Sequence, residues 1–141
     1  MREINLDAKD VIAGRLASYA AKHALLGYTI NVFNCESAVM SGTKRDIRAR
    51  YQHLIFDTGR PRTGPFISRQ PDRFMRHMIR GMVQHKRKRG AEAYARVMCY
   101  LGVPAAFAEK KLLNITKKVT DLPILRYVTI KDLCNSLGGK V

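Results

Sequence analysis

The sequence has 141 residues, a length that suits one domain over residues 1–141, and 46% of them are hydrophobic, which is enough for a buried core. Lys and Arg number 26 against 11 acidic residues, so the formal net charge is +15. Such an excess favours a polyanionic partner, either nucleic acid or an anionic membrane. No apolar run reaches the ~18–20 residues of a membrane-spanning helix, and the first residues lack a signal-peptide pattern. Composition therefore predicts nucleic acid as the partner, no membrane partner and a cytoplasmic location.

Residues that could perform catalysis or hold a metal are scattered along the sequence. Cys35, Cys99 and Cys134 are odd in number and far apart, which indicates free thiols in a reducing compartment. The four histidines have no metal-ligand spacing relative to these cysteines. His53 and Asp57, four residues apart, are the nearest approach to a nuclease pair. We expect no enzymatic activity, no metal, no cofactor and no small-molecule substrate.

The first third of the sequence predicts a strand, a helix and a second strand. Polar and apolar residues alternate over residues 3–7, as in a half-buried strand. Residues 14–26 have a helical repeat in which the buried stripe is mostly alanine, and Gly27 is placed to end that helix. Residues 28–33 are rich in β-branched and aromatic side chains. This order predicts a βαβ unit with parallel strands and a right-handed crossover.

The next segment predicts a helix followed by a basic loop. Thr43 and Asp46 resemble a capping box, which would begin a helix with Ile47, Tyr51 and Leu54 on its buried side. Residues 58–70 contain two glycines and two prolines among several arginines, so a loop is expected there.

The rest of the sequence predicts alternating helices and strands. Pro71 suits the first position of a helix that extends to about residue 83. A second basic loop is expected at residues 84–90, followed by a short helix. Further strands are predicted at residues 97–101 and 126–130, a short helix near 105–111, and a last helix that ends at Leu137.

Positive charge is concentrated between Arg60 and Arg96. This segment of 37 residues holds eleven Lys or Arg residues and two acidic residues, so it carries +9, more than half of the total. Arginine dominates, and its planar guanidinium forms bidentate contacts with phosphate better than lysine does. The four consecutive cations from Lys86 to Arg89 could be a nuclear-localisation signal, a generic basic loop or a phosphate clamp. Their mutual repulsion favours the phosphate clamp.

The helix predicted after Pro71 has two different faces. Its large apolar residues fall on one arc, and Arg73, Arg76, His77 and Arg80 fall on the opposite arc. Asp72, four positions before Arg76, is the one acidic residue at that spacing from the three arginines, so we expect this arc to contact RNA. Replacing Arg76 and Arg80 with Glu should then weaken RNA binding without unfolding the protein. Phe66 and Tyr51 could stack on a base, although an aromatic residue beside a sheet more often belongs to the core.

Several segments together resemble one family. The match keeps its order and spacing over about residues 4–104. The segments are Gly14-Arg15-Leu16-Ala17-Ser18, Asn34-Cys35-Glu36-Ser37-Ala38-Val39-Met40-Ser41-Gly42, Gly64-Pro65-Phe66, Pro71-Asp72-Arg73, Ile79-Arg80-Gly81-Met82-Val83 and Tyr100-Leu101-Gly102-Val103-Pro104. They resemble the ribosomal protein L13 family of the large subunit. Cytosolic eukaryotic members carry a long basic C-terminal extension that has no counterpart in this sequence, so the archaeal type is expected.

The resemblance implies a fold, a role and a set of contact residues. The fold would be a three-layer α/β/α domain with a mostly parallel four-stranded sheet. The role would be a non-enzymatic constituent of the large ribosomal subunit that binds rRNA early in assembly, beside neighbouring ribosomal proteins. The expected rRNA-binding residues are Arg60, Arg62, Arg69, Arg73, Arg76, Arg80, Lys86, Arg87, Lys88 and Arg89, together with Lys44, Arg45 and Arg48. A free RNA-binding regulator, a DNA-compacting protein and a basic nuclease stay as alternatives at this point.

Overall fold

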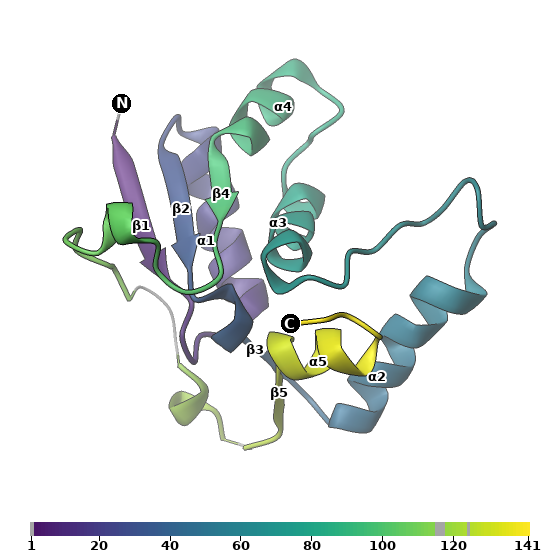
Figure 1. Ribbon diagram of the computed structural model, residues 1–141. Coiled ribbons are helices and arrows are strands. Elements are labelled where there is room, and N and C mark those ends of the chain that lie inside the picture. The colour runs from purple at the N-terminus through teal and green to yellow at the C-terminus, as the bar shows by residue number, and fades with distance from the viewer. Residues whose placement is uncertain (1, 115–117, 124) are drawn as a thin grey trace.

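A parallel sheet with the strand order β1-β2-β4 lies at the centre of the fold in the computed structural model, which describes residues 2–114, 118–123 and 125–141 (Figure 1). The strands are β1 (Glu3–Asp7), β2 (Thr29–Phe33) and β4 (Val97–Cys99). β1 pairs with β2 over its whole length, and β2 pairs with β4 over three residues. The α/β class and the parallel pairing predicted for the first two strands are confirmed.

Helix α1 (Ala13–Leu25) covers one face of this sheet and lies behind it in Figure 1. Five of its thirteen residues are Ala and none is β-branched, which favours a helix. The predicted alanine stripe is buried, and its small side chains allow the helix to lie close to the strands. Gly27 ends the helix with a φ of +97°, a backbone conformation that favours glycine.

The opposite face of the sheet is covered by an irregular segment. The 3-10 helix η3 (Ala105–Phe107) brings the Phe107 ring to 5.1 Å from the Phe33 ring of β2, and Tyr100 stacks on Phe33 at 5.3 Å. Beyond these rings this face is polar, because β1 and β2 alternate between apolar and polar side chains.

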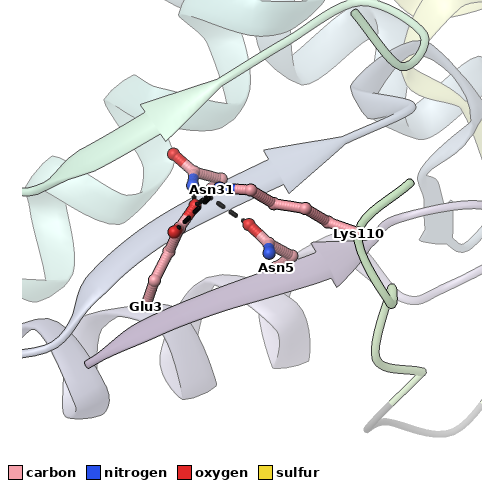
Figure 2. A network of polar contacts seen from close by, with 4 residues as sticks. All are labelled: Glu3, Asn5, Asn31 and Lys110. Carbon is pink, nitrogen blue, oxygen red and sulfur yellow. Dashed lines mark hydrogen bonds and ion pairs between the residues drawn. The ribbon is translucent and has the colours of Figure 1, made fainter. Parts of the chain in front are cut away.

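A hydrogen-bonded network fastens this segment to the polar face (Figure 2). Asn31, only 5% exposed, donates to Glu3 Oε1 at 2.7 Å and to Asn5 Oδ1 at 3.0 Å. Lys110 Nζ lies 3.0 Å from both Glu3 carboxylate oxygens. Buried polar groups need such partners, so the network stabilises the fold and fixes the position of residues around Lys110.

The sheet differs from the four-stranded sheet that the family resemblance implied. β5 (Tyr127–Thr129) does not join β1, β2 and β4 but pairs antiparallel with β3 (Val39–Ser41) in a separate two-stranded sheet. The chain is directed away from the main sheet just after β2, where Asn34 has a φ of +56° and the 3-10 turn η1 (Cys35–Ser37) follows. The free edge of β1 is extended by a single bridge between Leu6 and Leu113. The third layer that the resemblance implied is occupied by η3 in place of an α-helix.

Four further helices complete the part of the chain that the structure describes. They are α2 (Lys44–Gln52), which continues into the π-helical turn η2 (His53–Asp57), α3 (Pro71–Met82), α4 (Lys88–Ala95) and α5 (Ile130–Ser136). Figure 1 shows α3 beside α1, with α2 and the chain that follows it extending away from the sheet. None of the helices α1 to α5 is long and apolar enough to span a membrane.

Three local predictions differ from the structure. The Thr43 hydroxyl contacts the Asp46 carboxylate and not the backbone, so no capping box forms at the start of α2. The residues expected on the buried side of this helix, Ile47, Tyr51 and Leu54, are half-buried, because α2 lies at the periphery of the fold. α4 begins at Lys88, so the last three residues of the loop predicted at 84–90 are helical.

We predict that Ala20→Leu lowers the free energy of unfolding by about 1–3 kcal/mol, because Ala20 is fully buried in α1 and the larger side chain overpacks the site. The matched control is Ala49→Leu on the exposed side of α2, which should change stability by less than about 0.5 kcal/mol. Urea denaturation followed by circular dichroism measures both. Equal stability of the two variants would contradict the packing of α1.

Candidate nucleic-acid interface

Helix α3 has the two faces that the sequence predicts. Phe74, Met75 and Ile79 are buried against the core, while Arg73 and Arg80 are exposed. Pro71 occupies the start of the helix, and Asp72 lies in its first turn, where a negative charge complements the helix dipole. The core therefore fixes the direction in which the exposed arginines point.

Arg76 has a different environment from Arg73 and Arg80. It is half-buried, and its Nε donates to the Val97 carbonyl at 3.1 Å. Its guanidinium carbon lies 4.5 Å from the centre of the Tyr94 ring, a cation–π contact. Arg76 thus joins α3 to α4 and β4. The sequence did not predict this packing role, and a Glu at position 76 would place a carboxylate beside the Val97 carbonyl.

Arg96, also within the basic segment, has a structural contact of the same kind. Its guanidinium donates to the Ala24 carbonyl at the end of α1, at 3.0 Å. Two of the eleven cations between Arg60 and Arg96 therefore hold the fold together, and the others lie on the surface.

The basic loop at residues 84–89 folds back on itself where it leads into α4. Arg87 N–H donates to the Gln84 carbonyl at 2.9 Å, and a Cβ on Gly90 would lie 2.0 Å from that same oxygen. Only glycine permits this close approach. The four consecutive cations, Lys86 to Arg89, are all exposed, and the first turn of α4 contains no acidic residue. Cations at a helix N-terminus are unfavourable, so the segment is suited to a bound anion.

The basic segment at residues 58–70 and helix α2 carry the remaining candidate residues, all of them exposed. Arg60, Arg62 and Arg69 lie on the chain between η2 and α3, and the basic residues of α2 precede them. The elements that carry the candidates are α2, residues 58–70, α3 and residues 84–89. All lie beyond β4, on the side of the sheet away from β1 (Figure 1). We call them together the cationic surface.

The cationic surface has almost no internal neutralisation. Within residues 2–114, 118–123 and 125–141, the only Lys or Arg with a carboxylate within 4.0 Å is Lys110, which pairs with Glu3 on the other side of the sheet. None of the thirteen candidate residues therefore has an ion pair within the described residues that would offset its repulsion by the others. A polyanion at this surface would remove that repulsion. RNA contact by each residue stays a prediction.

Two basic residues near this surface were missed from the sequence. Arg50 is exposed in α2, and its place among the other basic residues of this segment could have indicated it. Arg126 lies beside the start of α2, because its carbonyl accepts a hydrogen bond from Gly42 N–H at 2.8 Å. No sequence signal places Arg126 near the start of α2, because this proximity depends on the β3–β5 pairing.

Residues with catalytic potential are not organised into a site among the described residues. His53 Nδ1 and Asp57 Oδ2 lie 3.5 Å apart, but both side chains are about two-thirds exposed. No group of three His, Cys, Asp or Glu residues in the same ranges could hold a metal. The pKa of the Cys35 thiol is raised by its hydrogen bond with Cys99 and by burial. Burial also raises the pKa of the Cys134 thiol to about 11. Thiols of this kind stay protonated and are poor nucleophiles.

Comparison with known proteins identifies the family. A sequence profile described as "Ribosomal protein L13" matches residues 2–106 of this chain. The chain belongs to the ribosomal protein L13 family. The L13-family resemblance inferred from the sequence motifs is thereby confirmed, and the protein falls among ribosomal proteins and not among enzymes.

Archaeal members of the L13 family match over nearly their whole length. The chain is 37% identical over 136 residues to the large ribosomal subunit protein uL13 of Methanococcoides burtonii, covering 96% of this chain and 97% of that protein. It is 38% identical to uL13 of Methanopyrus kandleri (94% and 85%) and 36% identical to uL13 of Haloarcula marismortui (97% and 92%). The expected archaeal type agrees with these relatives.

We predict that Arg76→Ala lowers the free energy of unfolding by about 1–3 kcal/mol, because it removes a charged hydrogen bond and a cation–π contact. Arg80→Ala, on the exposed side of the same helix, should change it by less than about 0.5 kcal/mol. Urea denaturation of both variants tests the assignment. If Arg80→Ala is as destabilising as Arg76→Ala, the two residues have been placed wrongly.

Proposed function

We propose that this L13-family protein is a structural, non-enzymatic constituent of the large ribosomal subunit that binds rRNA through its cationic surface, with neighbouring ribosomal proteins as further partners. The observation that carries the proposal is the lack of ion pairs across that surface in the described part of the chain. The relatives support it, since each is named a large ribosomal subunit protein.

The geometry suits the backbone of folded RNA. Phosphate contacts position a protein without reading sequence, and an arginine can contact a phosphate through two N–H groups at once. The cations come from α2, α3, the start of α4 and two loops, which all lie on the side of the sheet away from β1 (Figure 1). A broad basic face fits a structured RNA that is recognised by its shape.

Arg76 has its own part in this proposal. It holds α3 against α4 and β4, and α3 and α4 carry the exposed cations on either side of it. The residues proposed to contact rRNA directly are the other twelve: Lys44, Arg45, Arg48, Arg60, Arg62, Arg69, Arg73, Arg80, Lys86, Arg87, Lys88 and Arg89.

We predict that Arg73→Glu combined with Arg80→Glu weakens binding to large-subunit rRNA while the fold is retained, because both side chains are exposed. The log–log dependence of affinity on salt should become shallower by about 0.7–0.9 for each phosphate that the variant no longer neutralises. Filter binding over a series of salt concentrations measures both effects. The matched control is Lys9→Glu with Lys111→Glu, the same change of charge at exposed positions outside the cationic surface.

Equal loss of affinity in the control pair would show that only net charge matters, and the proposed surface would then be wrong. Sedimentation of cell extract separates the ribosomal role from a free RNA-binding regulator. A ribosomal constituent stays with the large subunit after a high-salt wash, whereas a regulator remains at the top of the gradient.

A further inference from the structure

A hollow of 310 Å³ lies within the cationic surface, between the end of η2 and the basic segment 58–70. Ile55, Phe56, Phe66 and Ile67 give it an apolar lining, and Arg60 and Arg69 add positive charge. The hollow therefore places apolar and cationic side chains next to one another.

Two phenylalanine rings at this hollow are largely exposed. Phe56 is 62% exposed and Phe66 is 69% exposed, whereas Phe33 and Phe74 are buried. Arg69 is the residue that contacts one of them, with its guanidinium carbon 5.3 Å from the centre of the Phe56 ring. Leaving two large apolar rings in water is unfavourable, so their exposure indicates a surface that is covered by a partner.

Tyr51, the other aromatic residue considered for stacking, has a different position. Its ring packs at 5.2 Å from the buried Phe74 ring, and burial raises the pKa of its hydroxyl. The half-buried Tyr51 therefore packs against the core at the α2–α3 contact, and Phe56 lies with Phe66 at the hollow.

The backbone of the segment gives the hollow a defined shape. Arg60 N–H donates to the Gly64 carbonyl at 3.2 Å, and Gly64 N–H donates to the Arg60 carbonyl at 3.0 Å. A Cβ on Gly59 would lie 1.8 Å from the Gly64 oxygen, so this closed turn requires glycine there. At the other end of the segment, a Cβ on Gly139 would lie 2.1 Å from the Arg69 carbonyl oxygen, so the tail after α5 packs closely on Arg69.

We propose that this hollow binds the base of an unpaired RNA nucleotide, with Phe56 and Phe66 as stacking residues and Arg60 and Arg69 as the contacts for its phosphates. The inference rests on the RNA-binding function proposed above and specifies part of it. Base–aromatic stacking beside arginines is a common means of holding single-stranded RNA. A base within a duplex has both faces covered by its neighbours, so a paired base cannot enter.

Charge decides between RNA and a protein as the occupant. Between residues 53 and 70 there are three arginines and one acidic residue, Asp57, whose carboxylate lies 3.5 Å from His53. The field at the hollow is therefore positive and complementary to a polyanion. A purely apolar protein segment would leave these arginines without partners.

The test uses the full chain and two RNA probes: a single strand of 12 nucleotides with 2-aminopurine at its centre, and a fully paired duplex of 12 base pairs. Phe56→Leu combined with Phe66→Leu removes the rings but keeps apolar side chains. Phe56→Tyr combined with Phe66→Tyr keeps the rings and serves as the matched control. Both positions are exposed, so neither pair should unfold the protein.

We expect the leucine pair to weaken single-strand binding by about 5- to 150-fold for each ring that stacks, and to abolish the quenching of 2-aminopurine. Duplex binding and the salt dependence should be unchanged, because the phosphate contacts remain. The tyrosine pair should bind both probes as the natural protein does.

Three outcomes would overturn the inference or its basis. If the natural protein binds neither probe in a salt-dependent way, the proposed RNA-binding function itself fails. If it binds both probes and the leucine pair retains full single-strand affinity and quenching, the hollow is not a base site although the cationic surface still binds RNA. If the leucine pair keeps RNA affinity but no longer associates with purified large-subunit proteins, a protein segment occupies the hollow.

Discussion

The packing of α3 on α1 is the contact on which the cationic surface depends. Alanines along the buried side of α1 allow a neighbouring helix to approach, and Phe74, Met75 and Ile79 of α3 are buried in the same core. At the far end of α3 the Ser18 hydroxyl reaches the Met82 sulfur at 3.5 Å. Because one side of α3 is held in this way, its exposed arginines have a fixed direction, and the two basic segments begin and end at fixed points.

Arginine has two separate roles in this protein. Arg76 and Arg96 donate to backbone carbonyls inside the fold and connect β4, α4 and α1 to their neighbours. Among the described residues, the twelve exposed cations of the cationic surface have no ion pair and no side-chain hydrogen bond to a backbone carbonyl, and their repulsion destabilises the free protein. Binding to a polyanion would remove this cost, so the stability of the protein and its occupancy by RNA are linked.

The elements with a strong periodic pattern could be predicted from the sequence with close bounds, whereas the short strand β3 could not. β1, α1, β2 and α3 appear within two residues of their expected bounds, since each has a clear repeat or a terminating Gly or Pro. β3 has only three residues, too few for an alternation of polar and apolar side chains to be detected. Its pairing with β5 was therefore missed, and so were the separate two-stranded sheet and the position of Arg126. The family resemblance implied four strands, but resemblance alone does not determine how short strands pair.

The cationic surface could likewise be predicted from the sequence only in part. The row of arginines on α3 follows from helical spacing, but spacing cannot distinguish Arg76 from Arg80, because the difference lies in whether Tyr94 and Val97 are within reach. In the same way, Phe66 could be singled out as an aromatic residue in a basic loop. Phe56 could not, because its exposure depends on the π-helical turn at the end of α2.

Ultraviolet cross-linking of intact large ribosomal subunits, followed by mass spectrometry of the attached peptides, tests the central claim most directly. The account predicts that peptides from residues 58–70, α3 and residues 84–89 carry cross-linked nucleotides, while peptides from residues 104–113 on the opposite face of the sheet do not. Cross-links confined to residues 104–113, with none on the cationic surface, would contradict it.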